Sequence, residues 1–310
     1  MTLVFFGSSE FSLAALKACL ESRQQVALVI TTPDQKKGRG LKLAPTVVRE
    51  FCIEKGIRVE APESLKDAAL IERVKSLQPD LFVVSSYGKL IPSTWLNIPS
   101  RLALNVHPSL LPKYRGAAPI NWPILNGDTQ TGVSIADVTS KLDSGDIFYQ
   151  EVVPLDSSMD AEVLERLLAG NSGKALKTVF EKIDNGTLSR TPQEESLSCY
   201  ARKLAKEDGR LSFKDPAAKL DRLIRGLKPW PGTYLEFGGN HLIILQAEAD
   251  PRNPSAEPGT LLEIHPQGEV SVATGEGSLK IKRVRPAGKK EMSAADFAHG
   301  RRLKPGSFFQ

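Results

Sequence analysis

Short, almost continuously apolar segments alternate with amphipathic segments through the first 185 residues of the chain. Residues 81–85 (LFVVS) and 102–107 (LALNVH) have the composition of strands that are buried on both faces. Segments between such runs, for example residues 10–20 and 161–183, repeat apolar positions at helical spacing. Strands that alternate with helices predict a parallel sheet with helices on both sides. We therefore expect an α/β fold with a doubly wound, mostly parallel sheet of the Rossmann-like type.

The same pattern predicts the other elements of this part of the chain. We expect further strands at residues 2–6, 25–31, 57–60, 133–138 and 147–153, and further helices at residues 47–55 and 67–77. A turn at residues 143–146 joins the last two strands.

The pattern changes after Asp184. Residues 185–195 are polar and contain Gly, Pro and Ser, which is typical of an exposed linker. A helix is expected at residues 216–227, followed by short strands separated by turn residues at 234–237, 241–247, 260–265, 270–273 and 279–284. Short strands at this spacing predict a small OB-like β-barrel. We expect three parts: an α/β domain at residues 1–189, a linker at 190–205 and a barrel at 206–310.

The composition agrees with a globular, non-membrane protein. Of the 310 residues, 41% are hydrophobic and 25% are charged, which excludes disordered and fibrous classes. The three widely spaced cysteines fit neither a disulfide framework nor a zinc cluster, and they favour a reducing compartment. We find no signal peptide at the start and no apolar run of the ~18 residues that a membrane span needs. We expect a soluble, cytoplasmic protein.

The net charge of +5 is unevenly distributed along the chain. Residues 1–200 hold 22 basic against 23 acidic residues, whereas residues 201–310 hold 19 against 13. Nine of these basic residues lie in the segment from Lys280 to Lys304, and this segment contains only two acidic residues. Such a segment is usually a solvated surface, but beside a neutral domain it also suits a polyanionic partner. Nucleic acid ranks above an anionic membrane, because no basic amphipathic helix of the membrane type is present.

The sequence lacks the signature motifs of several common enzyme classes. The turn after the first strand has one glycine, Gly7, where a dinucleotide-binding turn needs three. We find no phosphate-binding Gly-x4-Gly-Lys-Ser/Thr loop, no His-Glu-x-x-His and no Gly-x-Ser-x-Gly. An NAD enzyme, an ATPase, a zinc hydrolase and an α/β-hydrolase are disfavoured, and we expect no metal.

Asn105 and His107 form the strongest candidate for a catalytic site. Residues two apart on a strand point to the same face, so these two side chains project together. They lie at the carboxyl end of an expected parallel strand, where open α/β sheets bind their ligands. A histidine alone is more often a core residue whose hydrogen bonds are satisfied by its neighbours. An amide and an imidazole together at this position favour a functional site.

Two other segments become candidates for the same site because of this pair. Asp143-Ser144-Gly145-Asp146 reads first as a strand-connecting turn, yet Asp143 could orient His107, because an imidazole in acid–base work needs a carboxylate partner. Residues 33–45 (PDQKKGRGLKLAP) form an expected basic loop at the same edge of the sheet. Such loops are usually just solvated, but this one is placed to hold a phosphodiester backbone.

The residues that carry these features resemble those of a known family. Residues 107–116 (HPSLLPKYRG) and 142–146 (LDSGD) are similar to the signature of 10-formyltetrahydrofolate-dependent formyltransferases. Three further segments are similar to those of the members that act on methionyl-tRNA: residues 37–40 (KGRG), 229–231 (PWP) and 286–293 (PAGKKEMS). Pro108 departs from the glycine that many relatives carry. The resemblance spans nearly the whole chain.

The resemblance implies an enzyme that moves a formyl group from 10-formyltetrahydrofolate to the α-amino group of methionyl-initiator tRNA, for translation initiation. Asn105 and His107 would hydrogen-bond the developing oxyanion, and Asp143 would orient His107 and relay the amine proton. No metal or covalent nucleophile is needed.

The same resemblance implies where the two substrates bind. Tetrahydrofolate would lie at Ser109, Leu110, Leu111 and Pro112, with its pterin beside Tyr87, Gly88, Leu90 and Ile91. The candidates for tRNA contact are Arg39, Lys36, Lys37 and Lys42 in the basic loop and Lys282, Arg283, Lys289 and Lys290 in the barrel. Nothing in the sequence demands more than a monomer.

Two alternatives stay open. An amino-sugar nucleotide N-formyltransferase shares the Asn-x-His and Asp residues, but a nucleotide sugar needs no second domain with a charge of +6. A non-catalytic RNA-binding protein is disfavoured, because a protein without catalytic activity does not need Asn105, His107 and Asp143 together. Glycinamide ribonucleotide formyltransferase resembles only the first domain.

Overall fold

The computed structural model describes residues 1–37 and 42–309, which form two units. The first unit contains Met1–Pro119, Gln130–Pro154 and Leu164–Arg202. The second contains Ile120–Thr129, Leu155–Val163 and the chain from Lys203 onward. Two short stretches that lie within the first part of the sequence therefore belong to the second unit.

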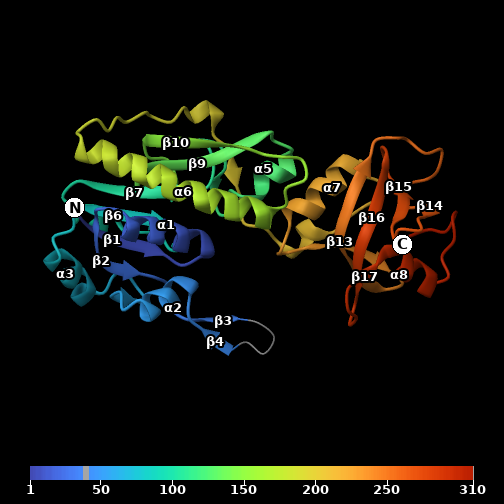
Figure 1. The fold of residues 1–310 in the computed structure, drawn as a ribbon, viewed down its shortest axis with the longest axis horizontal. Helices are drawn as coiled ribbons and strands as arrows, with labels where there is room; N and C mark the ends of the chain where they lie inside the picture. The colour runs from blue at the N-terminus through green and yellow to red at the C-terminus, as the bar shows by residue number, and fades with distance from the viewer. Residues whose placement is uncertain (38–41, 310) are drawn as a thin grey trace. The chain divides into compact units, whose positions relative to one another are not determined.

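A seven-stranded sheet forms the centre of the first unit, in the order β10-β9-β7-β6-β1-β2-β5 (Figure 1). The five strands from β7 to β5 in this order pair in parallel, whereas β9 runs antiparallel to β7 and β10 antiparallel to β9. The mostly parallel sheet predicted from the sequence is confirmed. The bounds are β1 (Thr2–Gly7), β2 (Gln25–Ile30), β5 (Val59–Glu60), β6 (Leu81–Ser85), β7 (Leu102–His107), β9 (Gln130–Asp137) and β10 (Ile147–Pro154).

Helices cover both faces of this sheet. Val4 and Phe6 of β1 pack in one buried cluster with Leu70, Val74 and Trp95. Because alternate residues of a strand face opposite sides, Leu3 and Phe5 point the other way; on that side, α1 and α6 lie next to each other (Figure 1). The helices are α1 (Glu10–Glu21), α2 (Val47–Glu54), α3 (Ala68–Ser76), α4 (Ser93–Leu96) and α6 (Ala161–Asp184).

Short strands that sequence patterns did not predict complete the first unit. β3 (Gln35–Lys37) and β4 (Lys42–Ala44) form an antiparallel pair inside the segment expected to be a loop. β8 (Arg115–Gly116) pairs in parallel with β11 (Tyr200–Ala201), so chain beyond residue 190 joins the segment after β7. A short 3-10 helix, η1 (Glu195–Leu197), precedes β11.

The second unit is built on an antiparallel sheet in the order β12-β13-β16-β15-β14, with β17 paired to β16. Its apolar core includes Leu220 and Ile224 from α7 and Phe297 from α8. The small antiparallel second domain predicted from the strand spacing is thereby confirmed. The bounds are η2 (Lys206–Gly209), α7 (Ala217–Gly226), β12 (Thr233–Phe237), β13 (Asn240–Asp250), β14 (Leu261–Ile264), β15 (Val270–Ala273), β16 (Ser278–Pro286), β17 (Met292–Ser293) and α8 (Ala294–Gly300).

Close backbone packing explains why α5 (Asn121–Asn126) belongs to this second unit. The Nδ2 of Asn121 donates a 2.7 Å hydrogen bond to the carbonyl oxygen of Gly226, on α7. A Cβ atom at Gly226 would lie 2.8 Å from the side chain of Leu125. A glycine at this position therefore allows the two helices to approach each other.

Candidate active site

β7 brings Asn105 and His107 to the same face of the sheet, as the sequence pattern predicts. β7 lies between β6 and β9: Asn105 pairs with Val84 on one side and Ala136 on the other, and His107 pairs with Ser134. His107 is buried, with only 5% of its surface exposed. The pair is therefore held by two neighbouring strands.

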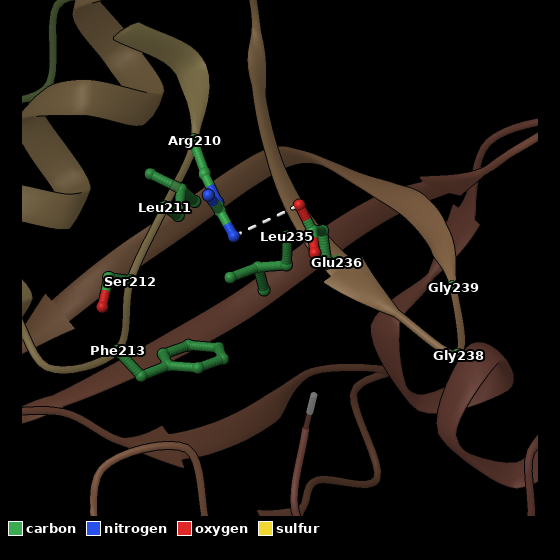
Figure 2. Close-up of a pocket in the computed structure, with 8 residues that line it drawn as sticks. All are labelled: Arg210, Leu211, Ser212, Phe213, Leu235, Glu236, Gly238 and Gly239. Atoms are coloured by element: carbon green, nitrogen blue, oxygen red, sulfur yellow. Dashed lines mark ion pairs between the residues drawn. The ribbon is translucent and has the colours of Figure 1, made fainter. Parts of the chain in front are cut away.

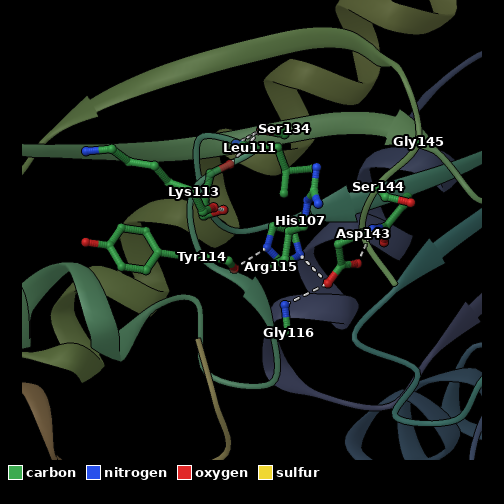
Figure 3. A network of polar contacts seen from close by, with 12 residues as sticks. His107, Leu111, Lys113, Tyr114, Arg115, Gly116, Ser134, Asp143, Ser144 and Gly145 are labelled. Atoms are coloured by element: carbon green, nitrogen blue, oxygen red, sulfur yellow. Dashed lines mark hydrogen bonds and ion pairs between the residues drawn. The ribbon is translucent and has the colours of Figure 1, made fainter. Parts of the chain in front are cut away.

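The carboxylate of Asp143 lies close to His107 and to the main chain of Gly116 (Figure 3). One oxygen, Oδ1, accepts a 2.9 Å hydrogen bond from Nδ2 of Asn105. The other, Oδ2, accepts a 2.9 Å hydrogen bond from the main-chain N–H of Gly116 and lies 3.8 Å from Nδ1 of His107. The structure therefore brings the Asp143 carboxylate close to Asn105 and His107, and the main chain of Gly116 adds a donor to it.

The geometry sets the tautomer of His107. Its Nε2 atom lies 2.9 Å from the carbonyl oxygen of Tyr114. Since a carbonyl oxygen can only accept a hydrogen bond, Nε2 carries the proton. In the neutral ring Nδ1 is then unprotonated, and this atom faces the carboxylate of Asp143. Nδ1 is therefore the ring nitrogen that is left to interact with other groups of the site.

The turn after β9 has an unusual backbone at Asp143. This residue has a φ of +48°, which few residues other than glycine adopt. A Cβ atom at Gly145 would lie 2.0 Å from the carbonyl oxygen of Asp137, so this position excludes other residues. The main-chain N–H of Asp137 donates a 2.8 Å bond to Asp146 across the turn. The turn thus presents the Asp143 side chain in one direction.

A cavity of about 470 Å³ lies beside these residues. Asn105, His107 and Asp143 line it, and four of the residues predicted to contact the folate, Tyr87, Gly88, Leu90 and Ile91, line it as well. Leu90 lines the cavity with a side chain that is 71% exposed. Burial raises the pKa of Tyr87 to about 12. The cavity has the apolar wall and polar end that suit a flat heterocycle.

The other predicted folate residues lie outside that lining. Ser109 is fully buried, and its hydroxyl donates a 2.6 Å bond to the carbonyl oxygen of Lys113. The main-chain N–H of Leu111 donates to Ser134, and Gln150 donates to the Leu111 carbonyl. Leu110 and Pro112 are partly buried in the same segment. These contacts tie the loop after His107 to β9 and β10.

The predicted tRNA residues differ in their surroundings. Lys282 pairs with Glu248 at 2.8 Å, and Arg283 pairs with Glu291 at 2.7 Å. Lys289 and Lys290 are exposed in the turn after β16. Arg39 lies outside the described residues, and so do the side chains of Lys36, Lys37 and Lys42, whose backbones form β3 and β4.

The second unit also contains two cavities. One, of about 600 Å³, lies beside the 3.2 Å ion pair of Arg210 and Glu236 and contains none of the predicted site residues (Figure 2). The other, of about 920 Å³, is lined by Arg283 and by the aromatic residues Trp230, Tyr234 and His241. The Tyr234 and His241 rings stack with centroids 4.2 Å apart.

Sequence reasoning missed the backbone partners of the site. Gly116 and Tyr114 act through main-chain atoms, which carry no residue-specific signal. Gln193 contacts the Asp143 turn from the segment expected to be a linker, and its polar character was the only available signal. In the described part of the chain, no group of three or more His, Cys, Asp or Glu side chains could hold a metal ion. No helix among these residues is long and apolar enough to cross a membrane.

Comparisons with known proteins agree with this fold. The family model for formyl transferases matches residues 1–180, and the model for the formyl transferase C-terminal domain matches residues 203–302. The two matches follow in the order of the two domains expected from the sequence. The chain therefore belongs to the formyl transferases and contains both the formyl transferase domain and the formyl transferase C-terminal domain.

Full-length relatives narrow this class. The methionyl-tRNA formyltransferase of Geobacter metallireducens is 35% identical over 99% of this chain and 97% of its own length. The one from Myxococcus xanthus is 38% identical over 98% of this chain and 96% of its own length. The chain belongs to the methionyl-tRNA formyltransferase family, which confirms the resemblance seen in its motifs.

Solved structures support the fold. The N-formyltransferase of Helicobacter canadensis, solved with folinic acid and dTDP-3-aminofucose, has a TM-score of 0.70 at 18% identity and covers 91% of this chain and 99% of its own. HypX of Aquifex aeolicus, solved with tetrahydrofolic acid, has a TM-score of 0.65 at 17% identity over 96% of this chain. The chain spans 46% of that longer protein. At these identities the likeness concerns the fold alone.

Proposed function

We propose that this protein transfers the formyl group of 10-formyltetrahydrofolate to the α-amino group of methionyl-initiator tRNA. The observation that carries the proposal is the carboxylate of Asp143, which is joined to Asn105 and faces His107 at the wall of one cavity. Full-length similarity to methionyl-tRNA formyltransferases supports the choice of acceptor.

The chemistry asks the site to move one proton and stabilise one negative charge. The neutral amine attacks the formyl carbon, and the carbonyl oxygen gains negative charge as the new C–N bond forms. The amine nitrogen then loses a proton, the bond from the formyl carbon to N10 breaks, and N10 gains a proton. An enzyme lowers this barrier with oriented donors for the oxyanion and a group that accepts and returns the proton.

Asn105 and His107 supply the donors. One N–H of the Asn105 amide is bonded to Asp143, and its second N–H is available for the oxyanion. His107 donates from Nδ1 once that atom holds a proton, because Nε2–H is already bonded to Tyr114. Loss of one such donor costs about 2.7–4 kcal/mol of transition-state stabilisation in acyl-transfer enzymes.

Asp143 and His107 together take up the amine proton and return it to N10. The carboxylate stabilises the imidazolium form, because opposite charges about 4 Å apart attract strongly where water is excluded. No covalent intermediate on the protein is needed.

The folate would lie in the cavity beside this pair. Tyr87, Gly88, Leu90 and Ile91 offer main chain and apolar surface for the pterin ring. We place the rest of the folate against Ser109, Leu110, Leu111 and Pro112, the segment that directly follows the catalytic strand. The ties of this segment to β9 and β10 would keep it rigid.

The second unit would hold the tRNA. Lys289 and Lys290 are exposed and suited to phosphate contact, and they join Lys282 and Arg283 on or just after β16. The stacked Tyr234 and His241 rings beside Arg283 resemble the platforms on which proteins hold unpaired bases. We assign Arg39 to the acceptor end of the tRNA on the strength of the family motif at residues 37–40, and Lys36, Lys37 and Lys42 to tRNA contact as basic residues of the same segment.

The protein would act as a monomer in the cytoplasm. One chain supplies Asn105, His107 and Asp143, so the site is complete without a partner. The exposed free thiol of Cys199 suits a reducing compartment, where charged initiator tRNA is also found.

One assay tests the proposal. The protein is incubated with 10-formyltetrahydrofolate and methionyl-initiator tRNA, and formylmethionine is measured after deacylation. We expect formylation that is lost in His107→Ala, while tRNA binding is retained. Formylation of an amino-sugar nucleotide instead of the tRNA would support the alternative enzyme, and tRNA binding without any turnover would support a non-catalytic RNA-binding protein.

A further inference from the structure

Gln193 reaches the catalytic turn from a segment that lies outside both family matches. Its side-chain nitrogen donates two hydrogen bonds to main-chain carbonyl oxygens, one to Asp143 at 3.0 Å and one to Gly145 at 2.6 Å. Both N–H groups of the amide can be used in this way. The side chain therefore spans the two residues that give the turn its shape.

A buried arginine holds Gln193 in place. The guanidinium of Arg115, which is fully buried, donates from Nε and Nη2 to the side-chain oxygen of Gln193 at 3.1 and 2.8 Å. Its Nη1 donates to both carboxylate oxygens of Glu195. The donors and the acceptor of the Gln193 amide are thus all engaged, so its orientation is set on both sides.

We propose that Gln193 is a positioning residue for the formyl-transfer site, which keeps the Asp143 carboxylate at its distance from His107 and Asn105. Gln193 touches none of the three catalytic side chains and acts through the main chain of Asp143. This inference rests on the proposed function for its kinetic consequences.

The backbone of Asp143 explains why such a brace is needed. With a φ of +48° the residue is in a conformation that its own side chain disfavours, so its neighbours must hold it there. Ionic contacts close to the turn involve other atoms: Lys141 pairs with Glu195 at 3.2 Å, and Arg190 pairs with Asp137 at 3.1 Å. The Gln193 amide, in contrast, bonds to the carbonyls of both Asp143 and Gly145.

The test uses two substitutions of opposite chemistry. Gln193→Met keeps the length of the side chain and removes its donors and acceptor. Gln193→Glu keeps an acceptor for Arg115 but brings a carboxylate oxygen against the two carbonyls. Misplacement of a catalytic group by about 1 Å can lower the rate by about 100-fold. We expect kcat to fall roughly 10- to 100-fold in Gln193→Met and further in Gln193→Glu, with KM for both substrates near the wild-type values.

A spectroscopic readout separates positioning from general stability and from the proposed function. The chain has four histidines, so ¹³C-labelled histidine gives a sparse NMR spectrum, in which loss of a signal in His107→Ala identifies that ring. We expect the His107 signals to move in Gln193→Met, measured well below its thermal unfolding midpoint, which should itself fall because the buried Arg115 loses an acceptor. The matched control is Glu194→Gln, the neighbouring residue, whose carboxylate accepts from Ser196.

The outcomes are distinct. Altered His107 signals in Gln193→Met, together with a fall in kcat and normal KM values, support the positioning role. Unchanged His107 signals and wild-type kcat in both Gln193 variants would overturn it, and so would a loss explained by unfolding in both. If the wild-type protein does not formylate methionyl-tRNA, the proposed function fails, while the NMR comparison still tests the effect of Gln193 on His107.

Discussion

Nδ1 of His107 and Oδ2 of Asp143 lie 3.8 Å apart, close enough for charge attraction but too far for a hydrogen bond. Asn105 and Gly116 hold the carboxylate at this distance. Because Nε2 of His107 is bonded to a carbonyl oxygen, a proton that arrives at the ring must go to Nδ1. The gap therefore lies on the side of the ring where the proposed mechanism requires a change of charge during formyl transfer.

Asp143→Asn should show how much this charge contributes. The amide keeps the shape of the side chain and can still accept from Gly116, but it cannot stabilise a protonated His107. We expect kcat to fall roughly 10²- to 10⁴-fold, the range for loss of acid–base catalysis, with little change in folate affinity. Single-turnover formylation and calorimetric titration with tetrahydrofolate measure the two quantities. A wild-type kcat in this variant would show that Asp143 takes no part in proton transfer.

Local patterns were enough to predict the strand that carries Asn105 and His107. The near-continuous apolar run of β7 indicated a buried strand, and the two-residue period placed both side chains on one face. The turn of Asp143 was also visible, since Asp and Gly mark turns. The contact between them was not, because it joins residues 38 positions apart in the chain.

Other parts of the site depend on contacts that a single sequence does not encode locally. Gln193 lies 50 residues from Asp143, in a polar segment with the composition of a linker. The ion pairs of Lys282 and Arg283 with Glu248 and Glu291 depend on the pairing of strands and turns in the second unit. The antiparallel direction of β9 relative to β7 was not predicted either, and the connection between these strands includes α5, which belongs to the second unit.

Lys289 and Lys290 should contribute to tRNA affinity through charge. Each lysine that contacts a phosphate releases counterions, so replacing it lowers the slope of log K against log salt by about 1. We expect Lys289→Ala/Lys290→Ala to weaken tRNA binding and flatten this slope, as measured by filter binding at several salt concentrations. Lys75→Ala, on α3, is the control. Equal slopes in the double variant and the wild type would show that both lysines are ordinary solvated residues without a phosphate contact.

The hydroxyl of Tyr87 is buried without a hydrogen-bond partner among the described residues. An unsatisfied buried hydroxyl is costly, so Tyr87→Phe should raise the free energy of unfolding by about 1 kcal/mol. Burial also raises the pKa of Tyr87 from 10.0 to about 12. Between these values the unfolded chain loses this proton while the folded chain keeps it, so wild-type stability falls as pH rises. Urea unfolding at neutral and alkaline pH should show that the free energy of unfolding declines less with pH in Tyr87→Phe than in the wild type. Equal declines in the two proteins would contradict this role of Tyr87.

Asp137 should have the opposite dependence from an ordinary surface carboxylate. Burial raises the pKa of Asp137 above its usual value, and the nearby charge of Asp146 adds to this, whereas Arg190 opposes it. The folded protein therefore holds this proton more tightly than the unfolded chain does. The stability it contributes is full below the unfolded pKa of about 4 and is lost as pH rises through the higher folded pKa. Asp137→Asn should thus raise the thermal midpoint at pH 7, with the difference vanishing near pH 3. Scanning calorimetry of both proteins across this range measures the effect, with Glu194→Gln as the control. A difference that stays constant with pH would show that the carboxylate charge is not its cause.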